Sequence, residues 1–368
     1  MKRLLIYTIS LLLPATVSAQ KIVLGSCYTA DKGLYQGEML GNKPHGKGKT
    51  DYANGDTYEG EYVKGKRQGY GVYTFTDGEK YEGQWYGGQQ HGKGTYYFAN
   101  NNRYEGLWFR DYQQGHGIMY YYTGDVYDGQ WYEDKRSGKG RYTFKQGAYY
   151  DGEWKYDMKW GKGTFDWGDG SSYEGQWVEN KRSGKGVFTY ASGDVYNGMW
   201  KEDQKNGRGI YKFRNGDVYE GDYVNDERTG NGVFKYANGD KYTGHFSAGD
   251  KDGQGTFTWK NGDVYTGFWK ADRQHGKGKL VKKIGDVYEG TFKAGSLDGE
   301  IIIHYADGSK YKGIYKNGKR EGKAIEENKE GIRFEGSYKD DERDGKFVEK
   351  DRNGQVIATG TYDMGERH

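Results

Sequence analysis

The sequence predicts an all-β protein, an elongated single-layer antiparallel meander of tandem 23-residue β-hairpin repeats. Three observations support this. One pattern recurs without gaps from Tyr35 to Val356, which indicates a repeat architecture. Within each repeat, apolar and polar residues alternate with a period of two, as in half-buried strands. Hydrophobic residues make up 33% of the chain and aromatic residues 17%, so aliphatic side chains are too scarce for a layered core.

Each repeat opens with an aromatic residue and has glycines at fixed positions. Fourteen rows follow in phase, and every row has Gly two and eleven residues after its opening residue. A further Gly follows thirteen residues after the opening in the first eleven rows. The opening residues are Tyr35, Tyr58, Tyr81, Tyr104, Tyr127, Tyr150, Tyr173, Tyr196, Tyr219, Tyr242, Tyr265, Tyr288, Tyr311 and Phe334. The alternation of Gly with aromatic residues on one face leaves room for rings to lie across the backbone.

Each row is predicted to form one hairpin. The row that opens at Tyr127 has a first strand at 127–131, a polar turn at 133–138 and a second strand at 140–144. A second tight turn closes the row, and in several rows it contains Asn-Gly, as at Asn54, because both residues tolerate positive φ. Chained hairpins then pair each strand with its sequence neighbours, in a ribbon about 130 Å long at ~4.8 Å per strand.

The C-terminal rows are predicted to cap the array. The third glycine of rows twelve to fourteen is replaced by Ile301, Ala324 and Phe347, and polar Asn328 and Asp351 replace second-strand aromatics. Polar terminal repeats protect the open edge of an array. Residues 357–368 shift by one and begin a partial repeat, so the organisation is fourteen repeats at 35–356 followed by this tail.

The N-terminus predicts export. Residues 1–19 have a basic start, an apolar run at Leu4–Leu13 and a small-x-small site at Val17–Ala19, which together indicate a signal peptide cut before residue 20. A lead-in at 20–34 precedes the repeats. The expected location is therefore periplasmic or extracellular. An alternative is a lipoprotein anchored at Cys27, although polar residues separate this cysteine from the apolar run.

Charge and cysteine content exclude several functions. The chain has 56 basic and 53 acidic residues, so we expect no nucleic-acid binding, which needs a clustered basic surface. The same balance weakens attraction to an anionic membrane by charge alone. Cys27 is the single cysteine, so an intrachain disulfide and a cysteine-based zinc site are excluded.

No motif predicts catalysis, a metal or a cofactor. Gly41–Lys47 resembles a phosphate-binding loop, but Gly48 stands where Ser or Thr must bind the metal. His45 and His91 share a repeat position but are two rows apart, about 19 Å, too far to share an ion. A ladder of carboxylates follows the opening aromatics at Glu59, Glu82, Glu105, Asp128, Asp151 and Glu174. Its members are equivalent, whereas catalytic pairs need distinct environments, so the ladder is interpreted as a solvated face and the protein as a non-enzyme.

The aromatic face is the candidate binding surface. One interpretation is that its rings only stack on one another as a thin core. The other is that part of the face stays accessible, since an exposed apolar strip usually marks an interaction site. In that case the binding residues are the tryptophans found one per row, which are Trp85, Trp108, Trp131, Trp154, Trp177 and Trp200.

The pattern Tyr-x-Gly-x-Trp followed by the spaced glycines, with a period of 23, resembles the MORN repeat over residues 35–356. The tail from Asp344 to Tyr362 resembles a shorter-spaced variant found in bacterial proteins. The resemblance implies a scaffold, a protein-binding platform or a membrane-associated module. We therefore expect a non-catalytic envelope scaffold that binds a protein partner or a second copy of itself. The alternative is a module that binds membrane lipid or cell-wall glycan through the aromatic face.

Overall fold

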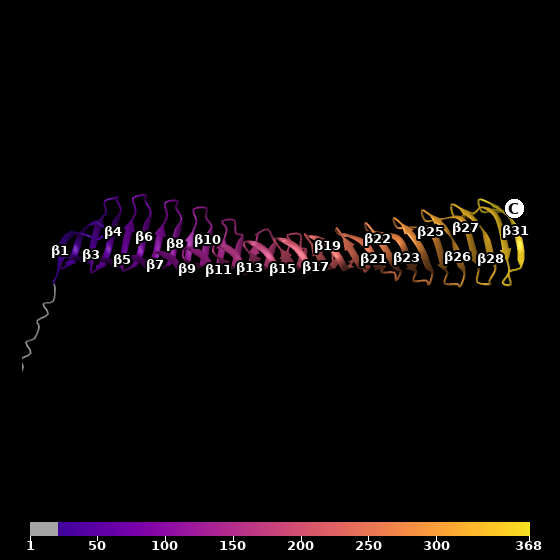
Figure 1. The fold of residues 1–368 in the computed structure, drawn as a ribbon, viewed down its shortest axis with the longest axis horizontal. Helices are drawn as coiled ribbons and strands as arrows, with labels where there is room; N and C mark the ends of the chain where they lie inside the picture. Colours follow the sequence, from indigo (N-terminus) through magenta and orange to yellow (C-terminus); the bar gives the residue numbers. More distant parts are fainter. Residues whose placement is uncertain (1–20) are drawn as a thin grey trace, which may run out of the picture. The chain divides into compact units, whose positions relative to one another are not determined.

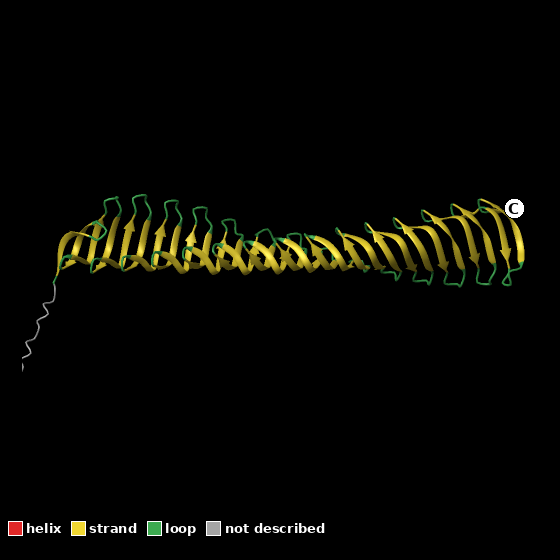
Figure 2. Ribbon diagram, in the orientation of Figure 1, coloured by secondary structure: helices red, strands yellow, loops and turns green. Residues whose placement is uncertain are grey.

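The computed structural model describes residues 21–368, and all regular structure in them is β-strand. The 32 strands form a single open antiparallel sheet in meander order (Figure 1). Short turns join the strands, and no helix is present in the described residues (Figure 2). These residues accordingly contain no helix that could span a membrane. The predicted fold class is confirmed, while the predicted signal peptide at 1–19 lies outside the described residues.

The described chain divides into two compact units, one of residues 21–146 with 154–157 and one of residues 147–153 with 158–368. The strands of the first unit are β1 (Ile22–Tyr28), β2 (Leu34–Leu40), β3 (Lys43–Asp51), β4 (Thr57–Val63), β5 (Lys66–Thr74), β6 (Lys80–Tyr86), β7 (Gln89–Tyr97), β8 (Arg103–Phe109), β9 (Tyr112–Tyr120), β10 (Val126–Tyr132) and β11 (Lys135–Thr143). The next strand, β12 (Tyr149–Lys155), has its last two residues in the first unit and the others in the second.

The second unit continues with the same alternation of strands of seven and nine residues, up to the shorter strands at its C-terminus. Its strands are β13 (Met158–Asp166), β14 (Ser172–Val178), β15 (Lys181–Thr189), β16 (Val195–Lys201), β17 (Gln204–Lys212), β18 (Val218–Val224), β19 (Glu227–Lys235), β20 (Lys241–Ser247), β21 (Asp250–Thr258), β22 (Val264–Lys270), β23 (Arg273–Val281), β24 (Val287–Lys293), β25 (Ser296–His304), β26 (Lys310–Lys316), β27 (Lys319–Glu327), β28 (Arg333–Lys339), β29 (Glu342–Arg343), β30 (Gly345–Lys350), β31 (Val356–Asp363) and β32 (Glu366–Arg367).

The lead-in contains a strand that the sequence did not predict. β1 pairs with β2 over seven residues, from Ile22 opposite Leu40 to Tyr28 opposite Leu34. Cys27 lies within this strand, opposite Tyr35, and burial raises the pKa of its thiol. The strand lies outside the 23-residue period, so the repeat pattern gave no signal for it.

Two kinds of turn join the strands, and the structure corrects the predicted turn chemistry. The polar stretch of a repeat supplies only a two-residue turn, as at Glu133 and Asp134, which have φ of 47° and 62°. Two positive φ values are what a type I′ hairpin turn requires. The closing turn is longer and has a single residue with positive φ in most repeats, usually a glycine such as Gly55 and in one repeat Asn101. Asn54 tolerates positive φ but does not adopt it, and its side chain accepts a hydrogen bond from the N–H of Asp56.

A bulge follows each two-residue turn and places a polar side chain on the aromatic face. In β10 and β11, Gly129 pairs with Gly140 but Trp131 pairs with Arg136, so the register shifts by two residues. Gly138, with φ of 78°, provides the irregular backbone. Cross-strand partners lie on the same face of a sheet. Arg136 therefore projects from the face that bears Trp131 and is half-buried, and the predicted turn over 133–138 is shorter than expected, since β11 already begins at Lys135.

The opening tyrosines form the centre of the core. Less than 2% of the surface is exposed for Tyr35, Tyr58, Tyr81, Tyr104, Tyr127, Tyr150, Tyr173, Tyr196, Tyr219, Tyr242, Tyr265 and Tyr311. The ring of Tyr104 lies across the paired Gly106 and Gly117, where an added Cβ would come within 2.4 and 2.3 Å of the tyrosine hydroxyl. That hydroxyl donates to the carbonyl of Leu107 at 3.0 Å. The predicted role of the glycines, to leave room for the rings, is confirmed.

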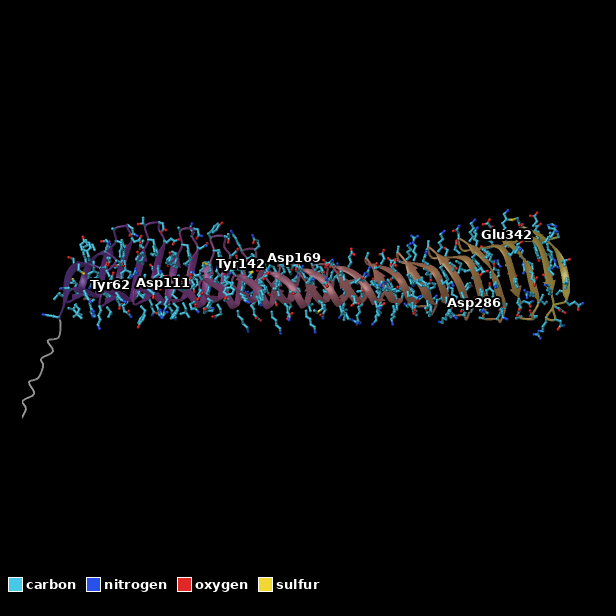
Figure 3. The ribbon with its side chains drawn as sticks, viewed as in Figure 1. Tyr62, Asp111, Tyr142, Asp169, Asp286 and Glu342 are labelled. Atoms are coloured by element: carbon cyan, nitrogen blue, oxygen red, sulfur yellow. The ribbon has the colours of Figure 1, made fainter. Side chains whose placement is uncertain are left out.

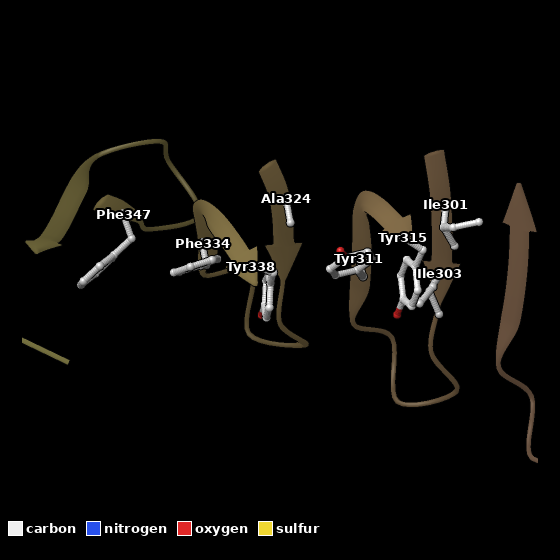
Figure 4. Packing of buried hydrophobic residues seen from close by; sticks show 8 residues of the cluster. All are labelled: Ile301, Ile303, Tyr311, Tyr315, Ala324, Phe334, Tyr338 and Phe347. Carbon is white, nitrogen blue, oxygen red and sulfur yellow. The ribbon is translucent and has the colours of Figure 1, made fainter. Parts of the chain in front are cut away.

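The C-terminal repeats have a different core, shown in Figure 4, in which aliphatic side chains replace glycines. Ile301 is fully buried, and its Cδ1 lies 2.6 Å from where a Cβ of Gly290 would be. This side chain takes the place that a tyrosine ring occupies in earlier repeats, so Tyr288 packs at the margin of the cluster and is only partly buried. At the end of the chain, Tyr362 packs against Phe347 with ring centroids 4.9 Å apart.

Candidate functional site

The six tryptophans predicted as binding residues are almost completely buried. Their exposed fractions are 4% for Trp85, 6% for Trp108, 5% for Trp131, 7% for Trp154, 3% for Trp177 and 4% for Trp200. Each indole N–H donates to the carbonyl of a glycine fourteen residues earlier, at 2.9 to 3.3 Å. The rings are therefore fixed parts of the core. Ligand binding by these residues stays a prediction, and it concerns chiefly Trp85, Trp108 and Trp131, which line a groove.

Tyrosine and tryptophan rings alternate along the aromatic face in edge-to-face contacts. The ring of Tyr104 contacts Trp108 of its own repeat and Trp131 of the next repeat, both at 5.3 Å between centroids and at angles of 89° and 86°. Such geometry adds ~0.5–1.5 kcal/mol per pair beyond the area buried. Each repeat is thereby tied to its neighbour, which explains how a single-layer sheet is stabilised.

A basic side chain covers the tryptophan in most of the tryptophan repeats. The guanidinium of Arg136 lies 4.4 Å from the ring centroid of Trp154, and Arg182 lies 4.4 Å from that of Trp200. The next turn holds the guanidinium in place, because Nε of Arg136 donates to Oδ1 of Asp157 at 3.0 Å and Nη2 donates to the Asp157 carbonyl at 3.1 Å. We call this arrangement of cation, ring and acidic turn the cation clamp. It combines a cation–π contact with a charge-assisted hydrogen bond.

Other repeats show variants of the same clamp. Arg67 lies 4.4 Å from the Trp85 centroid and donates to the carbonyl of Gly88, since no acidic residue is present in that turn. Lys159 lies 4.4 Å from the Trp177 centroid, and burial lowers the pKa of its ammonium group. The clamp position therefore accepts either basic residue.

Two consecutive repeats lack the cation but keep the acidic turn. Gln90 and Gln113 occupy the clamp position in front of Trp108 and Trp131, and they are only 8% and 5% exposed. The turn residues are Asp111, labelled in Figure 3, and Asp134. Oδ1 of each carboxylate accepts the backbone N–H of the glutamine, at 2.8 and 2.7 Å. Among the described residues neither carboxylate forms an ion pair, so the clamp is left without its positive charge.

The missing cations leave a groove of about 730 Å³ in the first unit. Arg67 lies at one end and Arg136 with Asp157 at the other, and the two glutamines, Asp111 and Asp134 line the space between them. The rest of the lining is apolar and comes from Tyr73, Phe75, Trp85, Tyr96, Phe98, Trp108, Met119, Tyr121 and Trp131. Desolvation raises the pKa of the Asp134 carboxyl, and the hydrogen bond from the Gln113 N–H and the charge of Lys135 oppose this rise only in part. The groove can therefore take a ligand that is apolar in part and positively charged.

The opposite face of the sheet carries the predicted carboxylate ladder, and two of its members form ion pairs with Lys or Arg at the surface. Glu82 pairs with Lys80 at 2.8 Å and Glu105 with Arg103 at 2.9 Å. His91, one of the histidines considered for metal binding, packs 5.2 Å from the ring of Phe109. No three His, Cys, Asp or Glu side chains in residues 21–368 are grouped to hold a metal ion.

Sequence reasoning missed the clamp, although a signal was present. The position nine residues after the opening aromatic is Arg or Lys in most rows and Gln at Gln90 and Gln113. An Arg or Lys in a polar stretch is usually interpreted as solvated. Here the stretch begins a strand, and the basic side chain covers an aromatic ring.

Comparison with solved structures gives matches of low sequence identity, two of which are described here. The TCP10 domain of CPAP from Danio rerio is 12% identical, with 60% of this chain and 98% of that chain covered and a TM-score of 0.32. Virginiamycin B lyase from Staphylococcus aureus is 11% identical, with 79% and 94% covered and a TM-score of 0.13. A search of curated proteins found no match.

A family model gives the informative match. The MORN repeat model matches thirteen segments, which are 35–57, 58–80, 81–103, 104–126, 127–149, 150–172, 173–195, 196–218, 219–241, 242–264, 265–287, 311–331 and 334–356. It passes over 288–310, the repeat in which Ile301 stands in place of the third glycine. That repeat still forms the hairpin of β24 and β25. With its sequence pattern, hairpin geometry and thirteen matched segments in agreement, the chain belongs to the MORN repeat family.

Proposed function

We propose that this protein is a non-catalytic scaffold of the cell envelope that binds a protein partner through the aromatic groove of its first unit. The supporting observation is the pair of incomplete clamps at Gln90 and Gln113, which leave a lined groove on the aromatic face. Near-equivalent repeats suit avidity, in which many similar contacts add up, better than they suit a unique catalytic centre.

Self-association is the second form of this proposal. The outer edge of β1 presents unpaired backbone groups together with exposed Ile22, Val23 and Leu24, the last 83% exposed. Free edge strands with apolar side chains are templates for pairing with another chain. Sedimentation of the purified mature protein tests this form, and a monomer at all concentrations would contradict it.

The alternative, binding of lipid or glycan, has less support. Sugar rings stack on exposed aromatic faces, whereas Trp108 and Trp131 are buried edge-to-face between tyrosines. The uncompensated Asp111 and Asp134 would repel anionic headgroups. Liposome flotation and pull-down on cell-wall polysaccharide test this alternative, and binding in either assay with none to protein would favour it.

Export is part of the proposal. Cleavage after Ala19 keeps β1 intact, while cleavage at Cys27 would remove Ile22–Ser26, five of the residues that pair with β2. We expect the mature protein to begin at Gln20, as read by mass spectrometry. A mature chain that begins at a lipidated Cys27, or that retains Met1, would overturn this expectation.

The groove itself is tested by photo-crosslinking in living cells. A photoreactive amino acid replaces Phe98 in the groove or, as the matched control, Leu107 on the opposite face of the sheet. We expect crosslinks to a discrete protein from position 98 and none from position 107. Truncation of Trp131 and Trp154 is a poor substitute for this test, because it would remove buried core rings and cost ~3–5 kcal/mol for each.

A further inference from the structure

The chain itself shows what the open positions of the groove would hold. In the repeats with a complete clamp, the guanidinium lies over the tryptophan and meets an aspartate of the following turn, as Arg136 does with Trp154 and Asp157. The same ring and the same acidic turn are present at Trp108 with Asp111 and at Trp131 with Asp134. Only the positive charge is missing, because glutamine is too short to reach the carboxylate and carries no charge.

The two glutamines are themselves unpartnered. Each is more than nine-tenths buried and lines the groove, yet the side-chain amides of Gln90 and Gln113 make no hydrogen bond to another described residue. Solvent in the groove reaches both amides, because none of their atoms is among the fully buried polar atoms without a hydrogen bond. These amides are therefore available to a polar group that enters the groove.

A third glutamine shows that the charge pattern is specific to the groove. Gln274 occupies the same position of its own repeat, but the residue in the following turn is Gly295, whose N–H donates to the Gln274 carbonyl. No carboxylate is present there, so the loss of the cation leaves no excess charge. In the repeats of Gln90 and Gln113 the aspartates remain, so each open position has a carboxylate without a paired cation, while Arg67 stands without a carboxylate at the end of the groove.

The spacing of the two open positions favours an extended ligand. Equivalent positions of neighbouring repeats are two strands apart, or ~9.5 Å. In a polyproline II helix the rise is ~3.1 Å per residue with three residues per turn, so side chains three residues apart point the same way at ~9.3 Å. Arginine suits both contacts, because its planar guanidinium stacks on aromatic rings and donates to carboxylates.

From this geometry we propose that the groove binds an extended segment of a partner protein that presents two arginines three residues apart, each completing one open clamp. The proposal rests on the proposed protein-binding function and specifies its ligand. One arginine would lie beside Trp108 and donate to Asp111, and the other would lie beside Trp131 and donate to Asp134.

The direct test is fluorescence anisotropy with labelled synthetic peptides and the full mature protein. The probe contains Arg-Pro-Pro-Arg, and two controls contain Arg-Pro-Arg or Gln-Pro-Pro-Gln in the same flanking sequence. We expect saturable binding of the first peptide, at least tenfold weaker binding of both controls, and an affinity that falls as salt is added. Equal binding of all three peptides, or binding of none, would overturn the proposal.

Substitutions in the groove then test where the peptide binds. Gln90→Arg with Gln113→Arg should close both clamps with the residue that other repeats carry, and should weaken peptide binding at least tenfold. Gln274→Arg is the matched control and should leave binding unchanged. As a second route that keeps the glutamines, Asp111→Asn with Asp134→Asn should weaken binding by a similar factor, whereas Asp203→Asn, at a clamp already filled by Arg182, should not. If neither groove variant weakens peptide binding, the assignment of the peptide site to the two open clamps is wrong.

The crosslinking assay separates this inference from the proposed function. If crosslinks from position 98 disappear in the Gln90→Arg and Gln113→Arg variant, the result supports both the inference and the proposed function. If they persist, the groove binds a protein without using the open clamps, so the inference is wrong and the proposed function survives. If the parent protein gives no crosslink from position 98, the proposed function itself is contradicted.

Discussion

The repeats that open at Tyr104 and Tyr311 form the same hairpin but differ, among other positions, in the residue thirteen places after the opening tyrosine. Gly117 in the first lets the ring of Tyr104 lie flat on the strand, and the Tyr104 hydroxyl donates to a carbonyl. Ala324 takes the same position in the second, and the buried hydroxyl of Tyr311 has no partner. A single methyl group thus separates a repeat with a satisfied tyrosine from one with an orphaned hydroxyl.

The two regions also differ in what fills the core. The first unit depends on tyrosines that lie between tryptophans, whereas the C-terminal cluster keeps Tyr311, Tyr315 and Tyr338 and adds Ile301, Ile303, Phe334 and Phe347. The difference teaches that the fold tolerates loss of the glycine–tyrosine arrangement only where aliphatic or phenylalanine side chains replace it. The same denaturing condition should therefore unfold the two regions to different extents.

Alkaline pH should produce the largest separation. Burial raises the pKa of Tyr35 and Tyr265 to about 12, and raises that of Tyr81, Tyr104 and Tyr127 as well. The unfolded chain releases these protons near pH ~10, so the stabilisation is complete below that value and is lost as pH rises through the folded-state pKa. With one such tyrosine in nearly every repeat, the loss should be steep.

Tryptophan fluorescence gives a regional measurement of this loss, because all ten tryptophans precede residue 270. We expect fluorescence to change at a lower pH than the β-sheet signal in circular dichroism, to which the C-terminal repeats also contribute. Coincident transitions, or an intact fluorescence signal at pH 12, would contradict the claim that the tyrosine repeats are the more sensitive region.

The matched substitutions Gly117→Ala and Ala324→Gly should give the next largest effect. An added methyl at Gly117 meets the Tyr104 hydroxyl at 2.3 Å and must displace a fully buried ring, at a cost of roughly 2–3 kcal/mol. At Ala324 the reverse change frees the Tyr311 hydroxyl to find a partner, a gain of ~1 kcal/mol that offsets the entropy cost of glycine in a strand.

Urea unfolding of both variants beside the parent protein measures these changes. Similar losses of unfolding free energy for the two would show that the two cores are equivalent after all. A destabilised Gly117→Ala beside a near-neutral Ala324→Gly is the expected result.

The sequence was sufficient to predict the strands, the meander and the role of the glycines, because these follow from a strict period and from backbone sterics. It was insufficient to predict which side chains are exposed to solvent. The pattern placed Trp108 and Trp131 on the aromatic face, but their burial depends on rings of the adjacent strands and of Tyr104. Residues such as Arg136 appeared solvated because hydropathy does not register a guanidinium stacked on an indole.

The groove was unpredictable for a related reason. It arises from two substitutions, Gln90 and Gln113, whose effect is visible only against the clamp of the other repeats. A polar-for-polar change in a polar stretch leaves the hydrophobic pattern untouched. Recognition of the site required knowledge that Arg136 and Asp157 meet across a turn, which is a relation between positions 21 residues apart.

The smallest effect, and the finest test of the clamp, compares Asp157→Asn with Asp134→Asn. Asparagine keeps the oxygen that accepts the backbone N–H in each turn, so only the charge is lost. Asp157 neutralises Arg136, and its loss should cost about 1 kcal/mol at pH 7 after allowance for solvent screening.

Asp134 has no such partner; its pKa is raised by burial, with Glu133 adding to the rise and Lys135 opposing it. A raised carboxyl pKa means that the ionised form destabilises the fold at neutral pH, and this cost fades as pH falls through the folded-state value. Asp134→Asn should therefore be neutral or stabilising at pH 7, with any gain gone at pH 3. Urea midpoints for both variants at the two pH values test this expectation. If Asp134→Asn lost as much unfolding free energy as Asp157→Asn, a basic group of the chain itself would already neutralise Asp134, and the prediction would be wrong.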